Sequence, residues 1–141
     1  MKSTASDIIR GLWNELYPDA IDTSGLDTLL AELEQARNTL TFGPQPDGWY
    51  KDAVVYALYV DFFNNTFDGL VQKLDQLQEL GVNCLWLLPI LESPMRDAGF
   101  DIRDYRNIRA GLLGLPADTP VEVKQRAFRE FLTMAHNRGI K

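Results

Sequence analysis

The chain of 141 residues contains one cysteine, Cys84, and one histidine, His136. A single cysteine excludes an internal disulfide, and its position in an apolar run is typical of a small buried thiol. A single histidine far along the chain excludes a Ser-His-Asp triad and a Cys-His pair, and its place near the end of a predicted helix favours a surface position. The sequence therefore does not support these common forms of nucleophilic catalysis.

Nucleotide-binding and metal-binding patterns are missing as well. No GxGxxG follows a predicted strand, no GxxxxGK[ST] is present, and the sequence has no clustered set of metal ligands. We therefore expect no cofactor and no metal ion.

Basic charge and long apolar runs are scarce. The formal net charge is -6 and the pI is near 4.7, whereas neutralising nucleic-acid phosphates requires a basic face. No segment reaches the roughly 18 apolar residues of a membrane span, and the amino terminus MKSTASDIIRG has no hydrophobic signal core. We expect no nucleic-acid or membrane partner and a cytoplasmic location.

What the sequence does have is the composition of a globular domain, 45% hydrophobic and 11% aromatic. Its length suits one ordinary domain. A closed (β/α)8 barrel usually needs about 250 residues, so the chain cannot be a whole barrel.

Two amphipathic helices are predicted first, over 6–17 and 26–40, because apolar residues recur at helical spacing. The run GPQPDG that follows can neither continue a helix nor join a central strand. The predicted organisation is a helical amino-terminal extension over 1–43, a linker over 44–48 and a second unit over 49–141.

The second unit alternates between strand and helix patterns. Residues 53–60 and 82–88 are apolar without alternation, which predicts strands covered on both faces. Leucines at helical spacing over 70–80 predict one helix between them, ending at Gly81. This order predicts a right-handed crossover with parallel strands and excludes an antiparallel meander.

A loop of some thirty residues follows the second strand, and such length usually indicates function. Thr119-Pro120-Val121-Glu122 predicts the start of the next helix with a capping box, and Gly139 its end. Ile140 and Lys141 then predict the beginning of a third strand. The fold class is α/β: an incomplete (β/α)8 TIM barrel of strand, helix, strand, long loop and helix, preceded by the helical segment.

The long loop concentrates candidate functional residues. A buried strand that ends at Pro89 and leads into a polar loop is how barrels build sites at their carboxyl rims. Four carboxylates lie on the loop, at Glu92, Asp97, Asp101 and Asp104. The three aspartates, with Phe100 and Tyr105, could line a sugar pocket. The aspartates could equally form turns around Gly99. Spacing alone leaves both interpretations open.

Three segments together resemble the start of an α-amylase catalytic barrel (glycoside hydrolase family 13). They are WYKDAVVY from Trp49, KLDQLQELGVNCLWLLPILESPMRDAGFDIRDY from Lys73, and AHNRGIK from Ala135. The segments are most similar to the branch of trehalose synthases, oligo-1,6-glucosidases and amylosucrases. The resemblance implies a (β/α)8 barrel that hydrolyses or transfers α-glucosyl units with retention, and an α-glucan or α-glucoside as small-molecule substrate.

Retention in this family implies two carboxylates about 5 Å apart, one attacking the sugar carbon and one protonating the leaving oxygen. The family carries them after its fourth and fifth strands, with a further aspartate after the seventh. The printed residues end before the third strand. We therefore assign no catalytic residue and expect the 141-residue chain to be inactive by itself.

The family's Gly-Tyr-Asp motif, which contacts the reacting glucose, matches Gly99, Phe100 and Asp101. The resemblance therefore implies that Asp101 binds sugar hydroxyls and Phe100 stacks on the ring. Ala57 stands where relatives often carry glutamine, and the turn over 64–69 is too short for the calcium loop of many relatives.

Two alternatives remain open. The chain could be a non-catalytic carbohydrate-binding or interaction module derived from the barrel, or an unrelated βαβ domain with a structural loop. The segment 109–119 is longer than the usual link into the following helix, and the sequence offers no account of it. Hydrolysis, isomerisation and transglycosylation are not distinguished.

Overall fold

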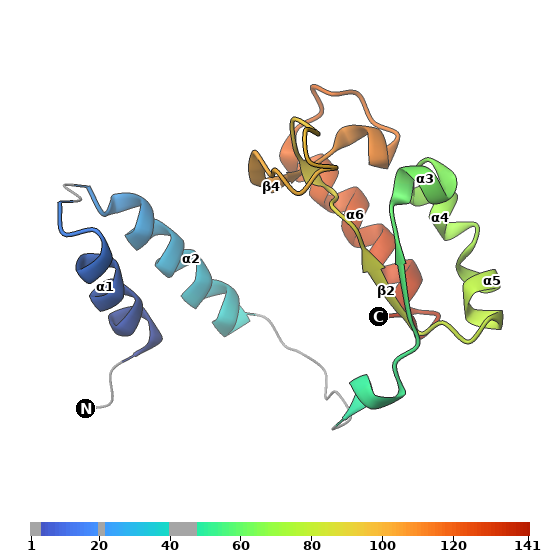
Figure 1. Cartoon of the computed structure of the whole chain (residues 1–141), viewed down its shortest axis with the longest axis horizontal. Helices are drawn as coiled ribbons and strands as arrows, with labels where there is room; N and C mark the ends of the chain where they lie inside the picture. Colours follow the sequence, from blue (N-terminus) through green and yellow to red (C-terminus); the bar gives the residue numbers. More distant parts are fainter. Residues whose placement is uncertain (1–3, 20–21, 40–47) are drawn as a thin grey trace. The chain divides into compact units, whose positions relative to one another are not determined.

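The computed structural model describes residues 4–19, 22–39 and 48–141. The chain divides into two units, Met1–Asp47 and Gly48–Lys141, which are taken separately here (Figure 1). The predicted linker over 44–48 lies, apart from Gly48, outside the described residues.

The first unit is a pair of helices, α1 (Ala5–Leu16) and α2 (Ser24–Thr39), as the periodicity predicted. Thr4 caps α1 by accepting a hydrogen bond from the third helical amide. The Ser6 hydroxyl donates to the Glu34 carboxylate at 2.8 Å and so joins the two helices. In the described ranges, no helix is both long and apolar enough to cross a bilayer.

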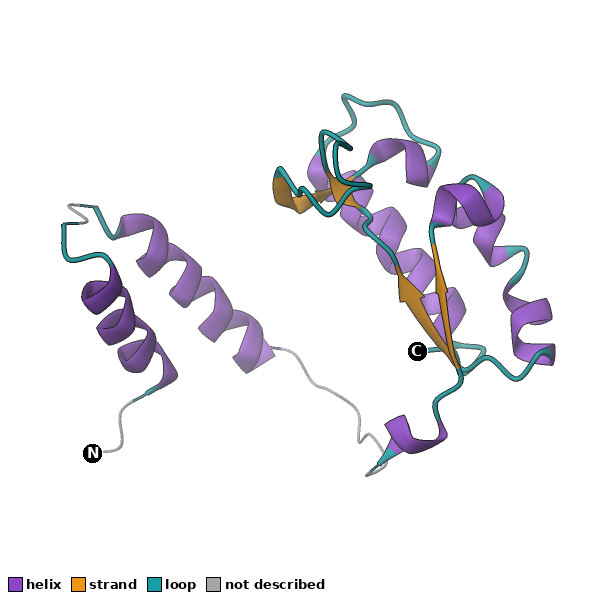
Figure 2. Ribbon diagram, viewed as in Figure 1, coloured by secondary structure: helices purple, strands orange, loops and turns teal. Residues whose placement is uncertain are grey.

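The second unit is built on a parallel pair of strands, β1 (Val55–Leu58) and β2 (Cys84–Leu87), as predicted (Figure 2). The other edge of β2 also forms backbone hydrogen bonds. The amide of Lys141 donates to the Asn83 carbonyl at 2.9 Å, and the Leu85 amide donates to the Lys141 carbonyl at 2.7 Å. The predicted start of a third strand therefore pairs with β2.

One face of this sheet is covered and the other is open. Leu58, Leu85 and Leu87 contact the core, whereas Val55 and Trp86 on the opposite face are 51% and 64% exposed. The prediction that both faces are covered is wrong for these residues, because the unit's helices cover only one side. Side chains alternate along a strand, so the open face carries every second apolar residue.

The prediction of one continuous helix over 70–80 is wrong, because the helix is interrupted. Three short helices occupy the connection between β1 and β2; they are α3 (Val60–Asn64), α4 (Phe67–Val71) and α5 (Leu74–Glu79). The Thr66 hydroxyl caps α4 by accepting from the Gly69 amide at 3.2 Å. The predicted leucines at 70, 74 and 77 are nevertheless buried, because the apolar spacing continues across the break.

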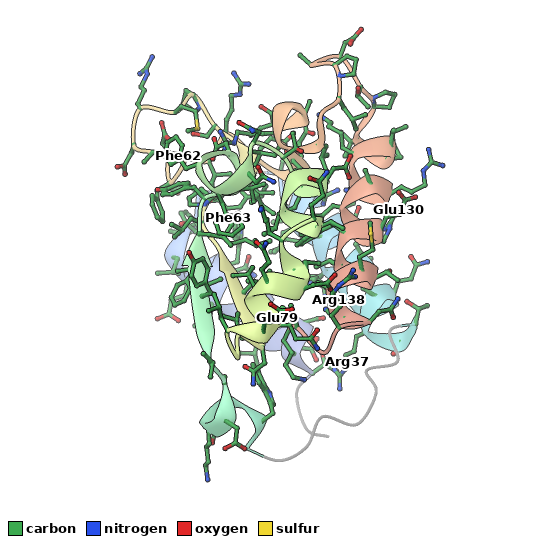
Figure 3. The ribbon with its side chains drawn as sticks, turned by 90° about the vertical axis from the view of Figure 1, so that its right-hand side faces the viewer. Arg37, Phe62, Phe63, Glu79, Glu130 and Arg138 are labelled. Atoms are coloured by element: carbon green, nitrogen blue, oxygen red, sulfur yellow. The ribbon has the colours of Figure 1, made fainter. Side chains whose placement is uncertain are left out.

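An aromatic cluster joins α4 to α6 (Val121–His136). The Phe67 ring lies 4.6 Å from that of Phe131 and 5.2 Å from that of Phe128, measured between centroids. Figure 3 shows Arg138 between the ends of α6 and α5, where its side chain pairs with Asp75. The two helices that follow β1 and β2 are thus fixed to each other.

The start of α6 differs from the prediction. Pro120 takes the cap position and no side chain caps the helix, so the capping box expected at Thr119 and Glu122 is absent. The helix ends as predicted, with Gly139 at φ +72°. His136 is exposed in the last turn, as expected from the sequence.

The long loop is partly ordered into β3 (Leu91–Glu92), β4 (Asp104–Ile108) and the 3-10 helix η2 (Ala110–Leu113). The strands β3 and β4 pair antiparallel as a hairpin, which the sequence analysis did not predict within the loop. Such pairing needs only a local reversal of the chain and no crossover. Leu112 and Leu113 of η2 enter the core, which explains part of the long 109–119 segment.

We predict that Gly69→Ala destabilises the chain by about 1–3 kcal/mol, because overpacking forces the backbone to shift. A Cβ atom at this position would lie 1.9 Å from the carbonyl oxygen of Asn64. Gly111→Ala is the matched control, since nothing lies within 4 Å of a Cβ atom there. Urea unfolding followed by circular dichroism measures both variants, and equal midpoints would contradict the prediction.

Candidate functional site

The candidate site is the loop that joins β3 to β4, residues 93–103. It follows β2, so it lies beyond the carboxyl end of a parallel strand, where α/β barrels place their functional loops. Figure 1 shows this loop and α3 at the same end of the sheet. The sequence prediction that function belongs on this segment therefore agrees with its position in the fold.

The Asp101 carboxylate organises the loop. One of its oxygens accepts from the Ser93 hydroxyl at 2.6 Å, and the other accepts from the Arg96 amide at 2.9 Å. The Ser93 hydroxyl oxygen also accepts from the Met95 amide at 2.9 Å. Both ends of the loop are thereby tied to one side chain.

The backbone between these contacts is strained. Met95 and Ala98 have φ of 59° and 50°, and Gly99 has φ of 92°. A left-handed conformation costs a residue with a side chain roughly 1–2 kcal/mol. A Cβ atom at Gly99 would lie 2.9 Å from the Cβ atom of Pro89, so only glycine fits beside that ring. Strain of this kind persists where surrounding contacts overdetermine the loop.

The hydrogen bonds on Asp101 also determine its charge. The Ser93 hydroxyl, followed by backbone donors that include the Arg96 amide, holds the pKa of Asp101 below its ordinary value. Donors to a carboxylate stabilise its ionised form. The lowered pKa of Asp101 therefore extends its charged form to more acidic pH than that of an ordinary aspartate, which is also ionised in the neutral range.

Beside it, the Phe100 ring is 59% exposed. Adjacent residues of the loop thus present an open aromatic surface and an ordered carboxylate. The structure brings together these two residues, which the sequence predicted as substrate-binding.

The other acidic residues of the segment have different surroundings. The Asp104 carboxylate accepts from the Arg106 amide at 2.9 Å, within its own strand. Glu92 lies between Arg103 and the buried Lys124, at 3.9 and 4.0 Å. These two carboxylates hold strands and helix in place, so the acidic cluster predicted from the sequence is not a single site.

Sequence reasoning missed Ser93 and Arg109. The Arg109 guanidinium contacts the Asp61 carboxylate at 3.4 Å and donates to the Pro89 carbonyl at 3.3 Å, which links the segments after β1 and β2. Serine is a common turn residue, and Ser93 lies two residues before the left-handed Met95, so a turn signal could have pointed to Ser93. No local pattern points to Arg109, because its partners lie 48 and 20 positions away.

The arrangement suits binding more than metal chemistry. Among the described residues, no three His, Cys, Asp or Glu side chains are grouped so that they could hold a metal ion. An exposed ring next to an ionised carboxylate can instead hold a hydroxyl-rich ring compound, through stacking and accepted hydrogen bonds.

Comparison with known proteins gives a family match over residues 16–141, to the family described as alpha amylase, catalytic domain. The match begins at the end of α1, earlier than the resemblance seen from Trp49. A trehalose synthase of Thermus thermophilus is 46% identical over an alignment of 101 residues, and the match covers 66% of this chain and 9% of that protein. An oligo-1,6-glucosidase of Heyndrickxia coagulans is 39% identical over an alignment of 100 residues, covering 66% of this chain and 16% of that protein.

Solved structures agree with these sequence matches. The trehalose-6-phosphate hydrolase of Bacillus licheniformis superposes with a TM-score of 0.51 at 34% identity, covering 66% of this chain and 16% of that chain. An isomaltulose synthase mutant of Erwinia rhapontici, solved with its natural substrate sucrose, gives a TM-score of 0.53 at 27% identity, covering 70% and 17%. The chain thus spans less than a fifth of the proteins that it matches, and its second unit is part of a TIM barrel.

We predict that Ser93→Ala raises the pKa of Asp101 toward the usual value of about 3.9, because it removes the largest cause of the lowered pKa. A lowered folded-state pKa stabilises the fold above the unfolded pKa, and this contribution is lost as pH falls through the folded pKa. The titration of the Asp101 carboxyl carbon by NMR measures the shift. Ser93→Thr is the control, since it keeps the hydroxyl; the same pKa in all three proteins would contradict the prediction.

Proposed function

This chain belongs to the α-amylase catalytic-domain family, and on that premise we propose that it forms the amino-terminal part of a retaining enzyme that hydrolyses or transfers α-glucosyl units. The relatives and structural neighbours are named for trehalose, sucrose-derived and oligoglucoside chemistry. One structural neighbour is named for a phosphorylated disaccharide. An α-glucan or α-glucoside is therefore the proposed substrate. Residues 1–43 are a helical extension in this proposal, and 49–141 supply the first part of the barrel.

The geometry of the loop at Phe100 and Asp101 is the observation that best supports the proposal. The exposed Phe100 ring offers a flat apolar surface to the C–H face of a pyranose. Asp101, held by hydrogen bonds from Ser93 and from the Arg96 amide, offers acceptors to its hydroxyl groups. Because strain and hydrogen bonds fix the loop before a ligand arrives, binding costs little ordering entropy.

Asp101 has the capacity for both roles. A carboxylate has about four lone-pair sites, and the Asp101 carboxylate accepts from the Ser93 hydroxyl and from the Arg96 amide. Backbone groups of Asp97 and Asp101 also lower its pKa, so a sugar hydroxyl would share these oxygens with the loop's own donors. The same side chain therefore shapes the loop and contacts the substrate.

Bond cleavage with retention requires a carboxylate nucleophile and a carboxylic acid about 5 Å apart. The α-amylase resemblance assigns both groups to later strands of the barrel than β1 and β2. In this proposal the chain contributes a wall of the pocket that holds the glucose, and no group that breaks the bond.

We predict that a chimera in which residues 49–141 replace the matching segment of the Thermus thermophilus trehalose synthase forms trehalose. Asp101→Asn should lower its kcat/KM roughly 10- to 100-fold, since a hydrogen bond to a charged group contributes about 1.5–3 kcal/mol. Phe100→Ala should lower kcat/KM through lost stacking. Steady-state assays of trehalose formation measure both.

Two controls accompany the chimera. Asp118→Asn changes an exposed aspartate in the 109–119 segment and should leave kcat/KM unchanged. Ser93→Ala removes a hydrogen bond that holds the loop but keeps the Asp101 carboxylate. If Asp101 had only a structural role, Ser93→Ala and Asp101→Asn would lower kcat/KM equally. That equality would contradict direct sugar contact.

We also predict that the 141-residue chain alone releases no glucose from maltose, sucrose or trehalose. A coupled glucose assay measures this. Turnover by the pure chain would refute the proposal. Tight binding of maltooligosaccharides to a folded monomer, measured by calorimetry, would favour a non-catalytic binding module instead.

A further inference from the structure

A buried lysine lies in the first turn of α6. Lys124 is 2% exposed, and it stands on the helix face of Phe128, Phe131 and Ala135, at spacings of three and four residues. Amphipathic helices carry apolar residues on such a face. A cation is also unfavourable at the amino-terminal end of a helix, where the macrodipole is positive. Both effects destabilise an ammonium group at this position, and a buried charge of this kind needs a partner of opposite sign.

The Glu92 carboxylate of β3 supplies that partner. Its Oε1 atom lies 4.0 Å from the Lys124 Nζ atom. Opposite charges at this separation attract each other more strongly where burial lowers the effective dielectric constant. Loss of either partner would leave the other charge uncompensated. Because α6 also packs against β4, the strand that pairs with β3, the ion pair joins the first turn of α6 to the hairpin of β3 and β4.

Glu92 is also the residue at which the two ends of the candidate loop meet. Ser93 follows it directly and donates to the Asp101 carboxylate at 2.6 Å. At the other end of the loop, the Arg103 amide donates to the Glu92 carbonyl at 2.8 Å. The Arg103 guanidinium lies 3.9 Å from the Glu92 Oε2 atom. A displacement of Glu92 therefore moves Ser93 relative to Asp101 and changes the hydrogen bond between them.

We propose that Lys124 is a positioning residue for the candidate loop: its ion pair with Glu92 sets where the Asp101 carboxylate stands. The inference rests on the proposed function in one respect, since it takes Asp101 as a contact of the sugar. It extends that function by giving a buried residue of α6 a part in the contact. The helix that covers the sheet thus determines the position of a carboxylate in the loop that follows β2.

The titration of the Asp101 carboxyl carbon by NMR, in the 141-residue chain, tests the proposal. The Ser93 hydroxyl is the largest cause of the lowered pKa of Asp101, so this pKa reports on the hydrogen bond. In Glu92→Gln, the loss of a nearby negative charge would by itself lower the Asp101 pKa further. Release of the ion pair weakens the bond from Ser93 and raises the pKa. We expect the pKa to rise in Glu92→Gln and in Lys124→Met.

Gln125→Ala is the matched control. Gln125 follows Lys124 in α6, and its side chain donates to the Arg106 carbonyl of β4 at 3.2 Å. This variant removes another bond between α6 and β4 but keeps the ion pair, so the Asp101 pKa should not change. Dispersed spectra establish that each variant is folded. Where an uncompensated charge unfolds a single variant, the double variant of Lys124→Met with Glu92→Gln replaces it and should show the same rise.

An unchanged or lowered Asp101 pKa in Glu92→Gln would overturn the inference. An equal rise in Gln125→Ala would also overturn it, because any weakening of the contact between α6 and β4 would then be sufficient. A rise in Glu92→Gln and Lys124→Met alone would support it.

The chimera with the Thermus segment replaced separates this inference from the proposed function. Lys124→Met should lower its kcat/KM about tenfold or more, because small misplacements of contact groups have effects of that size. Gln125→Ala should leave kcat/KM unchanged. If Asp101→Asn lowers kcat/KM and Lys124→Met does not, the positioning role is refuted while the sugar contact stands. If Asp101→Asn has no effect, the sugar contact is refuted, whereas a raised Asp101 pKa in Glu92→Gln still supports the role of the ion pair.

Discussion

The packing of Phe67 against Phe128 and Phe131 is the interaction on which the second unit depends. It joins the helix after β1 to the helix after β2, so that two parallel strands have a common covered face. A pair of parallel strands has no tight turn to hold it together and depends on its crossover helices. Because the strands are parallel, their carboxyl ends lie at the same edge of the sheet, and the candidate loop follows β2 there.

The loop at that edge combines strained backbone positions with hydrogen bonds that offset the strain. Left-handed residues such as Met95 and Ala98 are unfavourable by themselves. The Asp101 carboxylate stabilises them by accepting from Ser93 and from the Arg96 amide, and the same bonds keep it ionised. The loop therefore presents Phe100 and Asp101 in one geometry, which is the property that a substrate-binding surface needs.

The open face of the sheet fits the size of the chain relative to its family. Val55 and Trp86 are exposed on the side that a complete barrel fills with layers of inward side chains. The chain covers 9–17% of the relatives and neighbours compared with it. The unit is thus organised around its outer, helix-covered face, and the site loop is ordered without help from the opposite side of the barrel.

The sequence by itself determined the elements whose signals are local. The apolar runs predicted β1, β2 and their parallel order, and the family motif located Phe100 and Asp101. The leucine spacing predicted the buried Leu70, Leu74 and Leu77 but also included Leu80, which is exposed. Glycine at 81 and 139 marked helix ends because a left-handed backbone there favours a residue without a side chain.

Only the tertiary structure decided the remainder, since it depends on contacts between distant residues. The pairing of β3 with β4 needs Leu91 opposite Ile108. The link through Arg109 joins Asp61 to Pro89, positions that no periodicity connects. The donors that each acidic residue accepts from are set by packing. For Asp101 the donors within 3 Å come from a turn whose left-handed positions at Met95 and Ala98 no local pattern predicts.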